Sequence, residues 1–344
     1  MEKIRPQATV LITGATGFLG AHLVLEFLRH GYKVRATYRN ESSLNKARKV
    51  FSFYPETKSF LSNLEWFHLD LFCYNDVVES LKDVDYVVHA AAEVSFNVSN
   101  KNRIIENNTR ITAVVTDAAL ACNIKKLCHI SSIATLGTSA NGDIITEDIR
   151  WNSIRGNSGY SISKFYAEME VWRNIQNGLS AIIVNPSIIL GPGDWHSSST
   201  AFFSATASGL PFYTNGGSGF VDVRDVASAS RIALESHIEG DRFILSSENL
   251  TFESLFLKIA QNLHKRPPFI RIHSAIAKFA AVINQVVALI KRSEPKITLE
   301  SARAASKVRK YSGLKFSETF DFNYIPINET ISFISRCYIK DIKH

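Results

Sequence analysis

The hydrophobic positions of the chain fall into two alternating patterns. Short, apolar, β-branched runs predict buried strands, and they cover residues 8–13, 33–39, 64–71, 86–92, 126–134 and 180–184. Between these runs, apolar residues at helical spacing predict helices over residues 18–30, 108–122 and 160–177. Strands that alternate with helices are typical of parallel βαβ units with right-handed crossovers. The pattern therefore predicts an α/β fold with a doubly wound parallel sheet.

A glycine-rich turn joins the first predicted strand to the first predicted helix. Gly14, Gly17 and Gly20 are spaced three residues apart in it. Glycine at these positions allows a tight turn, close approach of the backbone to a pyrophosphate, and packing of the helix against the strand. The helix N-terminus adds free N–H groups and a partial positive charge. The turn therefore predicts a dinucleotide-binding site in a Rossmann-type domain.

The end of the second predicted strand indicates which dinucleotide binds. A site for NAD usually has an acidic residue there, which hydrogen-bonds the ribose 2′-hydroxyl. This chain has Arg39 at the strand end and Lys46 a short way beyond it. A guanidinium matches a 2′-phosphate in charge and in bidentate geometry. The sequence favours NADP as the cofactor, and NAD stays open because Glu41 lies close by.

The regular alternation of strands and helices ends near residue 186. Loops rich in glycine, serine and proline follow, and the C-terminal third is helical and mixed. We expect residues 1–185 to form the Rossmann domain that binds NADP, with residues 221–247 returning to it. Residues 186–220 and 248–344 are expected to form a smaller, mostly helical part that binds the substrate.

Composition and charge argue against several other classes of protein. Of the 344 residues, 45% are hydrophobic and 21% are charged, as in a globular protein with a sizeable core. The net charge is +7, but lysine and arginine are scattered, so no nucleic-acid partner is expected. The four cysteines show no CxxC spacing and predict neither a disulfide framework nor a metal site. Reduced thiols and an N-terminus without a signal-peptide core favour the cytoplasm.

One apolar segment raises the question of membrane contact. Residues 275–290 are rich in aliphatic residues but are interrupted by Lys278, Asn284 and Gln285. The run is shorter than the ~20 residues that a transmembrane helix needs. We expect a buried or groove-lining helix and no membrane association, with a helix lying on a membrane surface as the alternative. Together with the aromatic residues of the second half, the segment suggests a hydrophobic substrate.

Further motifs follow the glycine turn in a fixed order. They are Asp70-Leu71, His89-Ala90-Ala91-Ala92, Asn108, Ser131-Ser132, Tyr160 with Lys164, and Asn185-Pro186-Ser187. With the three-residue glycine spacing, this series over residues 8–230 resembles the extended branch of the short-chain dehydrogenase/reductase superfamily, the NAD-dependent epimerase/dehydratase type. Residues 34–39 and 191–195 look like its dihydroflavonol 4-reductase and 3β-hydroxysteroid dehydrogenase-like group. The chain departs from the family pattern at Ile111, where glycine is usual.

The resemblance implies a set of cofactor contacts. In the dihydroflavonol 4-reductase-like group, the counterparts of Arg39 and Lys46 receive the 2′-phosphate. In the superfamily, the counterpart of Asp70 contacts the adenine, the segment that matches residues 89–92 lines the ribose, and the stretch after the sixth strand holds the nicotinamide carboxamide. The expected cofactor-binding residues are Gly14, Thr16, Gly17, Phe18, Leu19, Gly20, Arg39, Lys46, Asp70, Leu71, Ala90, Ala91, Ala92, Tyr160, Lys164, Pro186 and Ser187.

Tyr160 and Lys164 carry the expected chemistry. They are four residues apart on a predicted helix and so share a face. A phenol with a pKa of ~10 is a poor acid or base at neutral pH, and a neighbouring ammonium lowers that pKa. Tyr160 would then exchange a proton with a carbonyl or alcohol oxygen, and Lys164 would bond the nicotinamide ribose.

Two further residues complete the catalytic candidates. Ser132 would hydrogen-bond and orient the reacting oxygen. We choose it over Ser131 because it lies five residues before Gly137, as in related sequences. Asn108 falls where the family has a structural asparagine. Near the site, Glu93, Phe96 and Trp195 either line the substrate pocket or pack in the protein.

These features predict an NADP(H)-dependent oxidoreductase that interconverts a ketone or aldehyde and an alcohol. One alternative is a nucleotide-sugar epimerase or dehydratase with tightly bound NAD, against which Arg39 argues. The other is a non-enzymatic NADP-binding regulator, against which the intact Tyr160 and Lys164 argue. Members of the superfamily often pair through the helices at 108–122 and 160–177, so a homodimer is expected.

Overall fold

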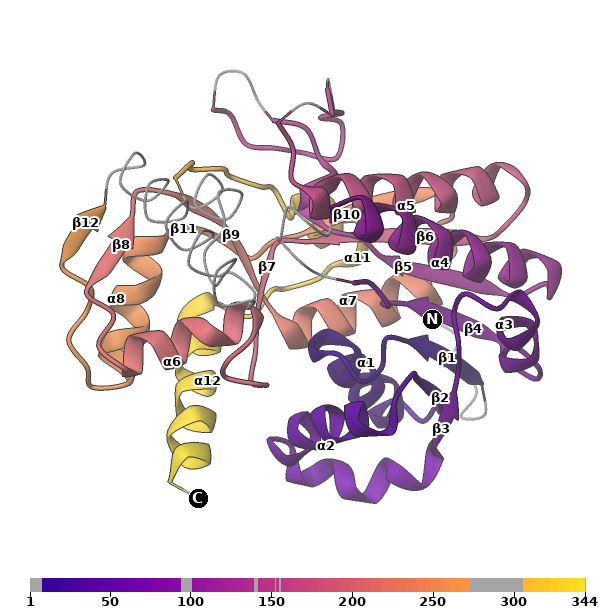
Figure 1. Cartoon of the computed structure of the whole chain (residues 1–344), viewed down its shortest axis with the longest axis horizontal. Helices are drawn as coiled ribbons and strands as arrows, with labels where there is room; N and C mark the ends of the chain where they lie inside the picture. The colour runs from indigo at the N-terminus through magenta and orange to yellow at the C-terminus, as the bar shows by residue number, and fades with distance from the viewer. Residues whose placement is uncertain are drawn as a thin grey trace.

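A parallel sheet of seven strands forms the centre of the protein in the computed structural model (Figure 1). The structure describes residues 8–93, 101–138, 142–151, 153–154, 156–272 and 306–343, and the predicted helix at 275–290 lies outside them. The strand order is β10-β6-β5-β4-β1-β2-β3. The strands are β1 (Thr9–Thr13), β2 (Lys33–Tyr38), β3 (Leu64–His68), β4 (Tyr86–His89), β5 (Lys126–Ile130), β6 (Ala181–Pro186) and β10 (Asp241–Leu245). The predicted doubly wound sheet is confirmed.

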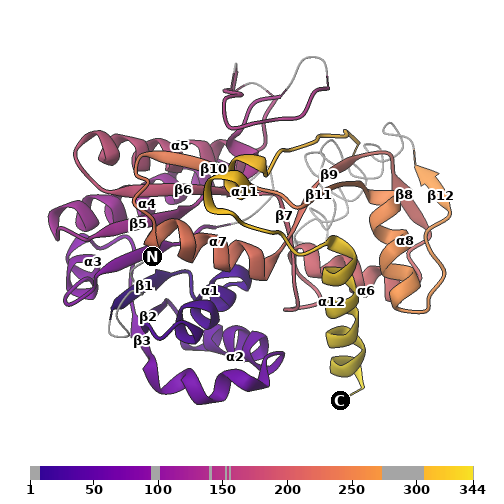
Figure 2. The same cartoon turned by 180° about the vertical axis from the view of Figure 1, so that it is seen from behind.

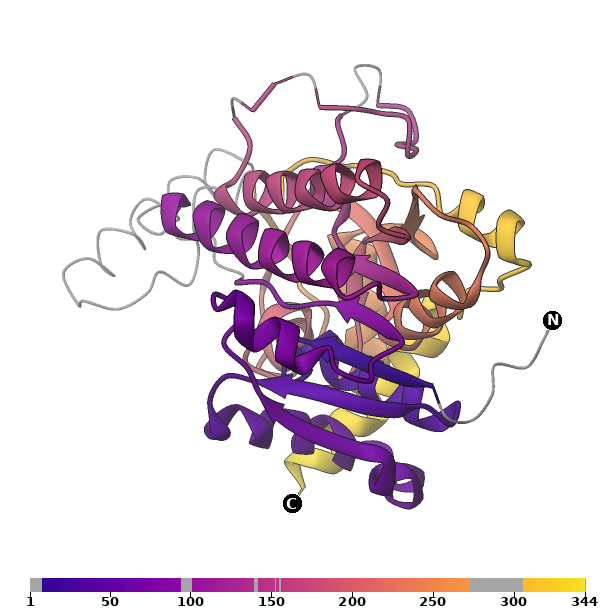
Figure 3. The same ribbon diagram turned by 90° about the vertical axis from the view of Figure 1, so that its right-hand side faces the viewer.

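Helices cover both faces of this sheet (Figures 1 and 3). Val10 and Ile12 of β1 pack in one core with α1 (Phe18–Arg29) and α7 (Val223–Glu235). Leu11, between them, packs in a second core with α4 (Lys101–Ala121) and α5 (Gly159–Gln176). Because side chains alternate along a strand, an unbroken apolar run serves both faces at once.

Some element bounds differ from the predicted ones. Helix α4 begins at Lys101 and not at residue 108, because its first turns are mostly polar and carry little apolar periodicity. Strand β5 ends at Ile130, and the 3₁₀ turn η4 (Ile133–Thr135) follows it, where the Ser132 side chain accepts from the Ala134 N–H. Two short helices were not predicted, α2 (Leu44–Ser52) and α3 (Tyr74–Ser80).

The second half of the chain adds a smaller part beside the sheet (Figure 2). Its strands are β7 (Ile188–Leu190), β8 (Phe212–Thr214), β9 (Gly217–Asp222), β11 (Glu248–Thr251) and β12 (Ile270–Ile272). Its helices are α6 (Ala201–Ala207), α8 (Phe252–Asn262) and α12 (Ile327–Ile342). Apart from β8 and β12, these elements share a separate apolar core that includes Phe203, Phe220 and Ile331.

Two segments return from the second half to the main sheet. Strand β10 pairs in parallel with β6, and α7 packs against α1. Helix α11 (Leu314–Phe320) also returns, because its Phe316 is buried in the core beneath β10. The chain therefore crosses between the two parts several times. Among the described helices, none is long and apolar enough to cross a membrane.

Candidate functional site

The glycine turn brings three backbone segments into close approach. Gly14 has a φ of +69°, and a Cβ there would lie 2.7 Å from the amide nitrogen of Ala91. A Cβ on Gly20 would lie 2.0 Å from the carbonyl oxygen of Gly14. Gly17 is the N-cap of α1, so the free N–H groups of that helix begin here. The turn has the form that a pyrophosphate cradle requires.

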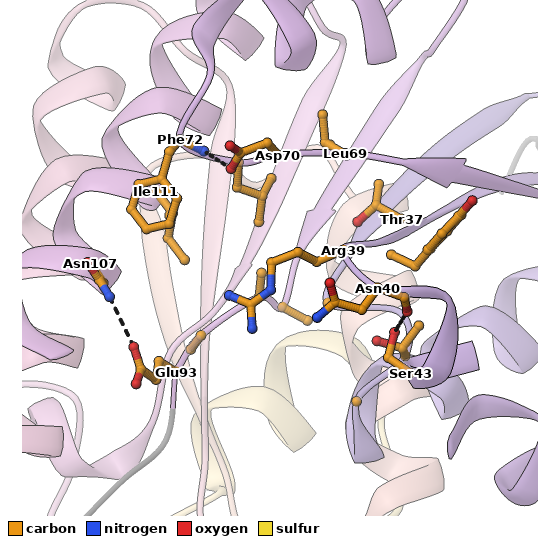
Figure 4. Close-up of a pocket in the computed structure, with 18 of the residues that line it drawn as sticks. Thr37, Arg39, Asn40, Ser43, Leu69, Asp70, Phe72, Glu93, Asn107 and Ile111 are labelled. Atoms are coloured by element: carbon orange, nitrogen blue, oxygen red, sulfur yellow. Dashed lines mark hydrogen bonds between the residues drawn. The ribbon is translucent and has the colours of Figure 1, made fainter. Parts of the chain in front are cut away.

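A cavity of about 560 Å³ opens beside this turn, along the carboxyl ends of β1, β2, β3 and β4 (Figure 4). Its volume is in the range of small-molecule and cofactor sites. The predicted residues that line it are Gly14, Thr16, Gly17, Arg39, Lys46, Asp70, Leu71, Ala90, Ala91, Ala92 and Asn108. Residues from six separate segments of the sequence thus meet in one cavity.

One side of the cavity carries positive charge. Arg39 and Lys46 are exposed lining residues, and the Arg39 side chain extends into the cavity (Figure 4). The backbone of Arg39 is held in place because its carbonyl oxygen lies 3.1 Å from Nε2 of His68. Asn40 and Ser43 line the same side and were not predicted. This group offers two cations and two polar side chains to an anionic ligand.

A chain of hydrogen bonds runs from the glycine turn to α4 through His89. The Ala91 N–H donates to Thr13 Oγ1, which lies 2.7 Å from His89 Nδ1. On the other side, His89 Nε2 lies 3.1 Å from Thr112 Oγ1, which donates to the Asn108 carbonyl. Burial, followed by the charge of Lys164, lowers the pKa of His89 to about 3, so its ring is neutral. His89 thus has a structural role in this network.

Asn108 is almost fully buried, and its amide is committed to internal bonds. Its Oδ1 accepts from the Glu93 N–H at 2.7 Å, and its Nδ2 donates to the Glu93 carbonyl at 2.9 Å. Nδ2 also lies 3.0 Å from Ser163 Oγ. The geometry gives Asn108 a role in positioning the chain and leaves its amide little capacity for a reacting group.

Ser132, Tyr160 and Lys164 come together where β5 ends and α5 begins. The Ser132 hydroxyl hydrogen-bonds the phenol of Tyr160. Lys164 is only 5% exposed, so the pair on α5 is not a surface pair. Its Nζ donates to the Ile130 carbonyl at 2.8 Å. Ser131, the neighbour of Ser132, points its hydroxyl instead to the buried carboxylate of Glu168.

Burial sets the protonation of this group. It raises the pKa of Tyr160, which the hydrogen bond from Ser132 partly offsets, so the direction is opposite to the lowering by Lys164 that the sequence predicted. It lowers the pKa of Lys164 to about 8, against the charge of Glu168, which raises it. At neutral pH the phenol is therefore protonated, and most of the lysine carries its charge.

Other predicted residues lie outside the lining of the cavity. Phe18 and Leu19 open α1, and the Phe18 ring packs against the backbone of Gly191 and Gly193. Ser132, Tyr160, Lys164, Pro186 and Ser187 do not line it. Yet Ser187 Oγ and Asn185 Oδ1 are buried without a hydrogen-bond partner in the described part of the chain. These orphaned polar atoms fit the predicted nicotinamide carboxamide site, where an amide would supply both partners.

The cavity also includes residues beyond the predicted cofactor contacts. Glu93 lines it and accepts from Arg103 at 2.6 Å and from Asn107 at 3.1 Å. Trp195, the other pocket candidate in the described residues, is buried in the smaller core and donates to Asp341 at 2.7 Å. It therefore packs in the protein. Phe96 lies outside the described residues.

Comparison with known proteins identifies the family. A model of the NAD dependent epimerase/dehydratase family matches residues 10–245, which is more than half of the chain. The chain belongs to this family. It is an extended short-chain dehydrogenase/reductase, and the glycine turn and the Tyr160–Lys164 pair lie within the matched segment. Members of this family are enzymes that use NAD or NADP. This confirms the predictions that the chain is an enzyme and that its cofactor is one of these two dinucleotides.

Proteins that are similar in sequence to this chain include a sterol demethylase protein and a dihydroflavonol reductase. Sterol demethylase protein B of Methylococcus capsulatus is 27% identical over 264 residues, 75% of this chain and 76% of that protein. Dihydroflavonol 4-reductase of Gerbera hybrida is 28% identical over 202 residues, 56% of this chain and 54% of that protein. The predicted likeness to dihydroflavonol 4-reductases is thereby confirmed.

Solved structures share the fold over nearly the whole chain. The crystal structure of gox2253 superposes with a TM-score of 0.79 at 26% identity, over 97% of this chain and 98% of that one. The UDP-glucose 4-epimerase of Thermus thermophilus, in complex with NAD, gives a TM-score of 0.71 at 20% identity, over 95% and 98%. Reductases by sequence and an epimerase by fold thus share one framework, and the chemistry must be argued from the side chains of this chain.

Proposed function

We propose that this family member is an NADP(H)-dependent oxidoreductase that interconverts a ketone or aldehyde and the corresponding alcohol. The observation that carries the proposal is the meeting of Ser132, Tyr160 and Lys164 at the carboxyl edge of the sheet. A proton donor, a group that orients the oxygen and a cation that stabilises the phenolate are the parts that carbonyl reduction requires of the protein.

Each of the three side chains has a separate task. In reduction, Tyr160 gives its phenolic proton to the substrate oxygen, while the Ser132 hydroxyl hydrogen-bonds that oxygen. The raised pKa of Tyr160 keeps the phenol protonated at neutral pH, which is the form that can donate. The Lys164 ammonium then stabilises the phenolate that is left. In oxidation the same groups act in the opposite order. When bound, NADPH supplies the hydride that the carbonyl carbon accepts.

The charges of the cavity support NADP as the cofactor. Arg39 and Lys46 line the cavity at the end of β2, where an NAD site usually has an acidic side chain. The phosphate cradle at Gly14 and Gly17 would hold the diphosphate, and Asp70 would contact the adenine. Pro186 and Ser187 would hold the nicotinamide.

The names of the relatives support an apolar carbonyl compound as the substrate. The relatives include a sterol demethylase protein, a dihydroflavonol reductase and, from Arabidopsis thaliana, Tetraketide alpha-pyrone reductase 2. These names point to ring compounds with little charge. We propose a small aromatic or sterol-like ketone, aldehyde or alcohol as the partner of this site.

The test follows the loss of NADPH absorbance with a panel of apolar ketones, aromatic aldehydes and nucleotide sugars. We compare the wild type with Tyr160→Phe and with Tyr166→Phe, a matched change at an exposed tyrosine on the same helix. Loss of the proton donor should lower kcat by about 10²- to 10⁴-fold, whereas Tyr166→Phe should keep it. NADPH binding should persist in both variants.

Three outcomes would contradict the proposal. Turnover of nucleotide sugars alone, with NAD⁺ that stays bound, would identify an epimerase or dehydratase. Undiminished turnover by Tyr160→Phe would remove Tyr160 as the general acid/base. NADPH binding without turnover of any compound, together with a cellular effect that Tyr160→Phe leaves unchanged, would indicate a regulator.

A further inference from the structure

A buried glutamate lies on the same face of α5 as the proposed catalytic pair. Glu168 follows Lys164 by four residues, and Lys164 follows Tyr160 by four, so the three share one side of the helix. Glu168 is only 1% exposed. Burial of a carboxylate lowers the stability of the fold unless its oxygens are hydrogen-bonded and its charge is compensated. The contacts of Glu168 therefore matter for the stability and the arrangement of this region.

The carboxylate of Glu168 accepts hydrogen bonds from four segments. Its Oε2 accepts from Ser131 Oγ at 2.6 Å, from Thr135 Oγ1 at 2.8 Å and from Asn185 Nδ2 at 3.0 Å. Its Oε1 accepts from Trp172 Nε1 at 3.3 Å and from an Arg242 guanidinium nitrogen at 3.2 Å. One side chain of α5 thus joins the end of β5, the turn η4, the end of β6 and β10.

These contacts surround Ser132. Ser131 precedes it, and Thr135 Oγ1, which bonds Glu168, also lies 3.0 Å from its carbonyl oxygen. Asn185 donates to the same carbonyl at 3.1 Å. The backbone on both sides of Ser132 is therefore tied to Glu168, directly or through one hydrogen bond. Asn185 also begins the stretch that is proposed to hold the nicotinamide.

We propose that Glu168 is a positioning residue for the reaction at Tyr160. It holds Ser132 and the Asn185–Ser187 stretch in register with α5, and its buried negative charge favours the ammonium form of Lys164. This inference rests on the proposed function, since it specifies how the same site is held and charged.

The other charged and titratable groups around Lys164 leave Glu168 as the anion that acts on it. His89 of β4 and His129 of β5 face Lys164, but burial lowers the pKa of both rings, so they are neutral at pH 7. Tyr160 lies on the same helix and is protonated. Arg242 of β10 contacts Glu168 and partly offsets its charge.

The first experiment measures kcat/KM against pH for the wild type and Glu168→Gln. Glutamine keeps the size of the side chain, but its amide nitrogen cannot accept a hydrogen bond. The donors that bond one of the two carboxylate oxygens therefore lose their acceptor. We expect kcat to fall about 10- to 100-fold, as for a misplaced reacting group. Loss of the anion lowers the pKa of Lys164. The fall of kcat/KM on the alkaline side of the pH profile, the alkaline limb, should therefore move about one pH unit lower.

The control is Glu170→Gln on the same helix, because Glu170 pairs with Arg173 near the surface. It should leave both kcat and the pH profile unchanged. Ser131→Ala separates position from charge, since it removes one hydrogen bond and keeps the carboxylate. It should lower kcat without moving the alkaline limb. NADPH affinity, measured by fluorescence, should be unchanged in Glu170→Gln.

A second experiment needs no turnover. Urea unfolding of the wild type, Glu168→Gln, Lys164→Met and the double variant gives the coupling between the two charges. Measured at about pH 6.5 and about pH 9.5, the coupling should be favourable at the lower pH and smaller at the higher one, where Lys164 loses its proton.

The outcomes separate this inference from the proposed function. No coupling at either pH, with an unmoved alkaline limb, would overturn the inference even if the wild type reduces carbonyl compounds. A wild type that reduces none of them, with coupling as expected, would overturn the proposed function and leave the buried pair established. If Glu168→Gln does not fold, Ser131→Ala still tests the positioning role, and unchanged kcat in that variant contradicts it.

Discussion

The side-chain amide of Asn108 lies 3.0 Å from the hydroxyl of Ser163 and so joins the cavity beside the glycine turn to the helix of Tyr160. Ser163 Oγ in turn donates to the Tyr160 carbonyl at 2.8 Å. On its other side, Asn108 holds the backbone of Glu93, which lines the cavity. One buried amide thus fixes the distance between the binding region and the proposed reaction centre.

We expect Asn108→Ala to destabilise the protein and to lower kcat. The change leaves the Glu93 N–H and carbonyl without their partner, which costs about 2–4 kcal/mol in total. Asn107→Ala is the control, because Asn107 is partly exposed and its amide donates to the Glu93 side chain at 3.1 Å. Thermal unfolding and steady-state kinetics measure both effects. Equal stability of the two variants would contradict the linking role of Asn108.

Arg39 should set the preference for NADP. Arg39→Asp replaces a cation by an anion that suits a 2′-hydroxyl, so we expect NADPH affinity to fall about 10- to 100-fold and NADH affinity to rise. Parallel fluorescence titrations with the two cofactors measure this. Arg48→Asp is the control, since Arg48 lies on α2 and bonds Asn45 away from the cavity. Equal affinity of the wild type for NADPH and NADH would contradict the NADP assignment.

Much of the framework could be predicted from local sequence. Strands β1 and β6 of the main sheet are buried on both faces, so each leaves an uninterrupted apolar run of the kind at Val10–Ile12. The glycine spacing at Gly14, Gly17 and Gly20 predicts a turn because its backbone contacts admit no Cβ at Gly14 or Gly20. These signals lie within a few residues of one another, which is why the sequence alone reveals them.

The contacts that organise the site could not be predicted in this way. Glu168 of α5 accepts hydrogen bonds from Asn185 of β6 and from Arg242 of β10. Nothing in the sequence near Glu168 specifies those partners. Its only local signal is the spacing of four residues after Lys164. The first turns of α4, which bring Arg103 and Asn107 to the cavity, are polar, and so the apolar period that marks a helix is weak there.

Gly20→Ala should disrupt the start of α1. The added methyl group would lie 2.0 Å from the Gly14 carbonyl oxygen, and backbone atoms there cannot move aside without opening the turn. We expect a loss of more than about 3 kcal/mol in the free energy of unfolding, together with loss of NADPH binding. The control is Gly178→Ala, where φ is +102° but no atom lies within 4 Å of the new Cβ. Its backbone strain alone should cost about 1–2 kcal/mol. A Gly20 variant as stable as the Gly178 variant would show that the turn has room to adjust.

Helices α4 and α5 lie side by side on one face of the sheet, where the family resemblance predicts a homodimer (Figure 3). Tyr166 and Met169 of α5 are 37% and 39% exposed and lie three residues apart, so they are neighbours on the surface of this helix. If a second copy covers them, a charge at Met169 would be buried without a partner, so Met169→Glu should yield monomers. Light scattering measures the mass, and circular dichroism checks that the fold is kept.

Leu257→Glu is the control, because Leu257 is 42% exposed on α8, away from these helices. A wild type that is monomeric at working concentration, or a Met169→Glu variant that stays dimeric, would contradict pairing through this face.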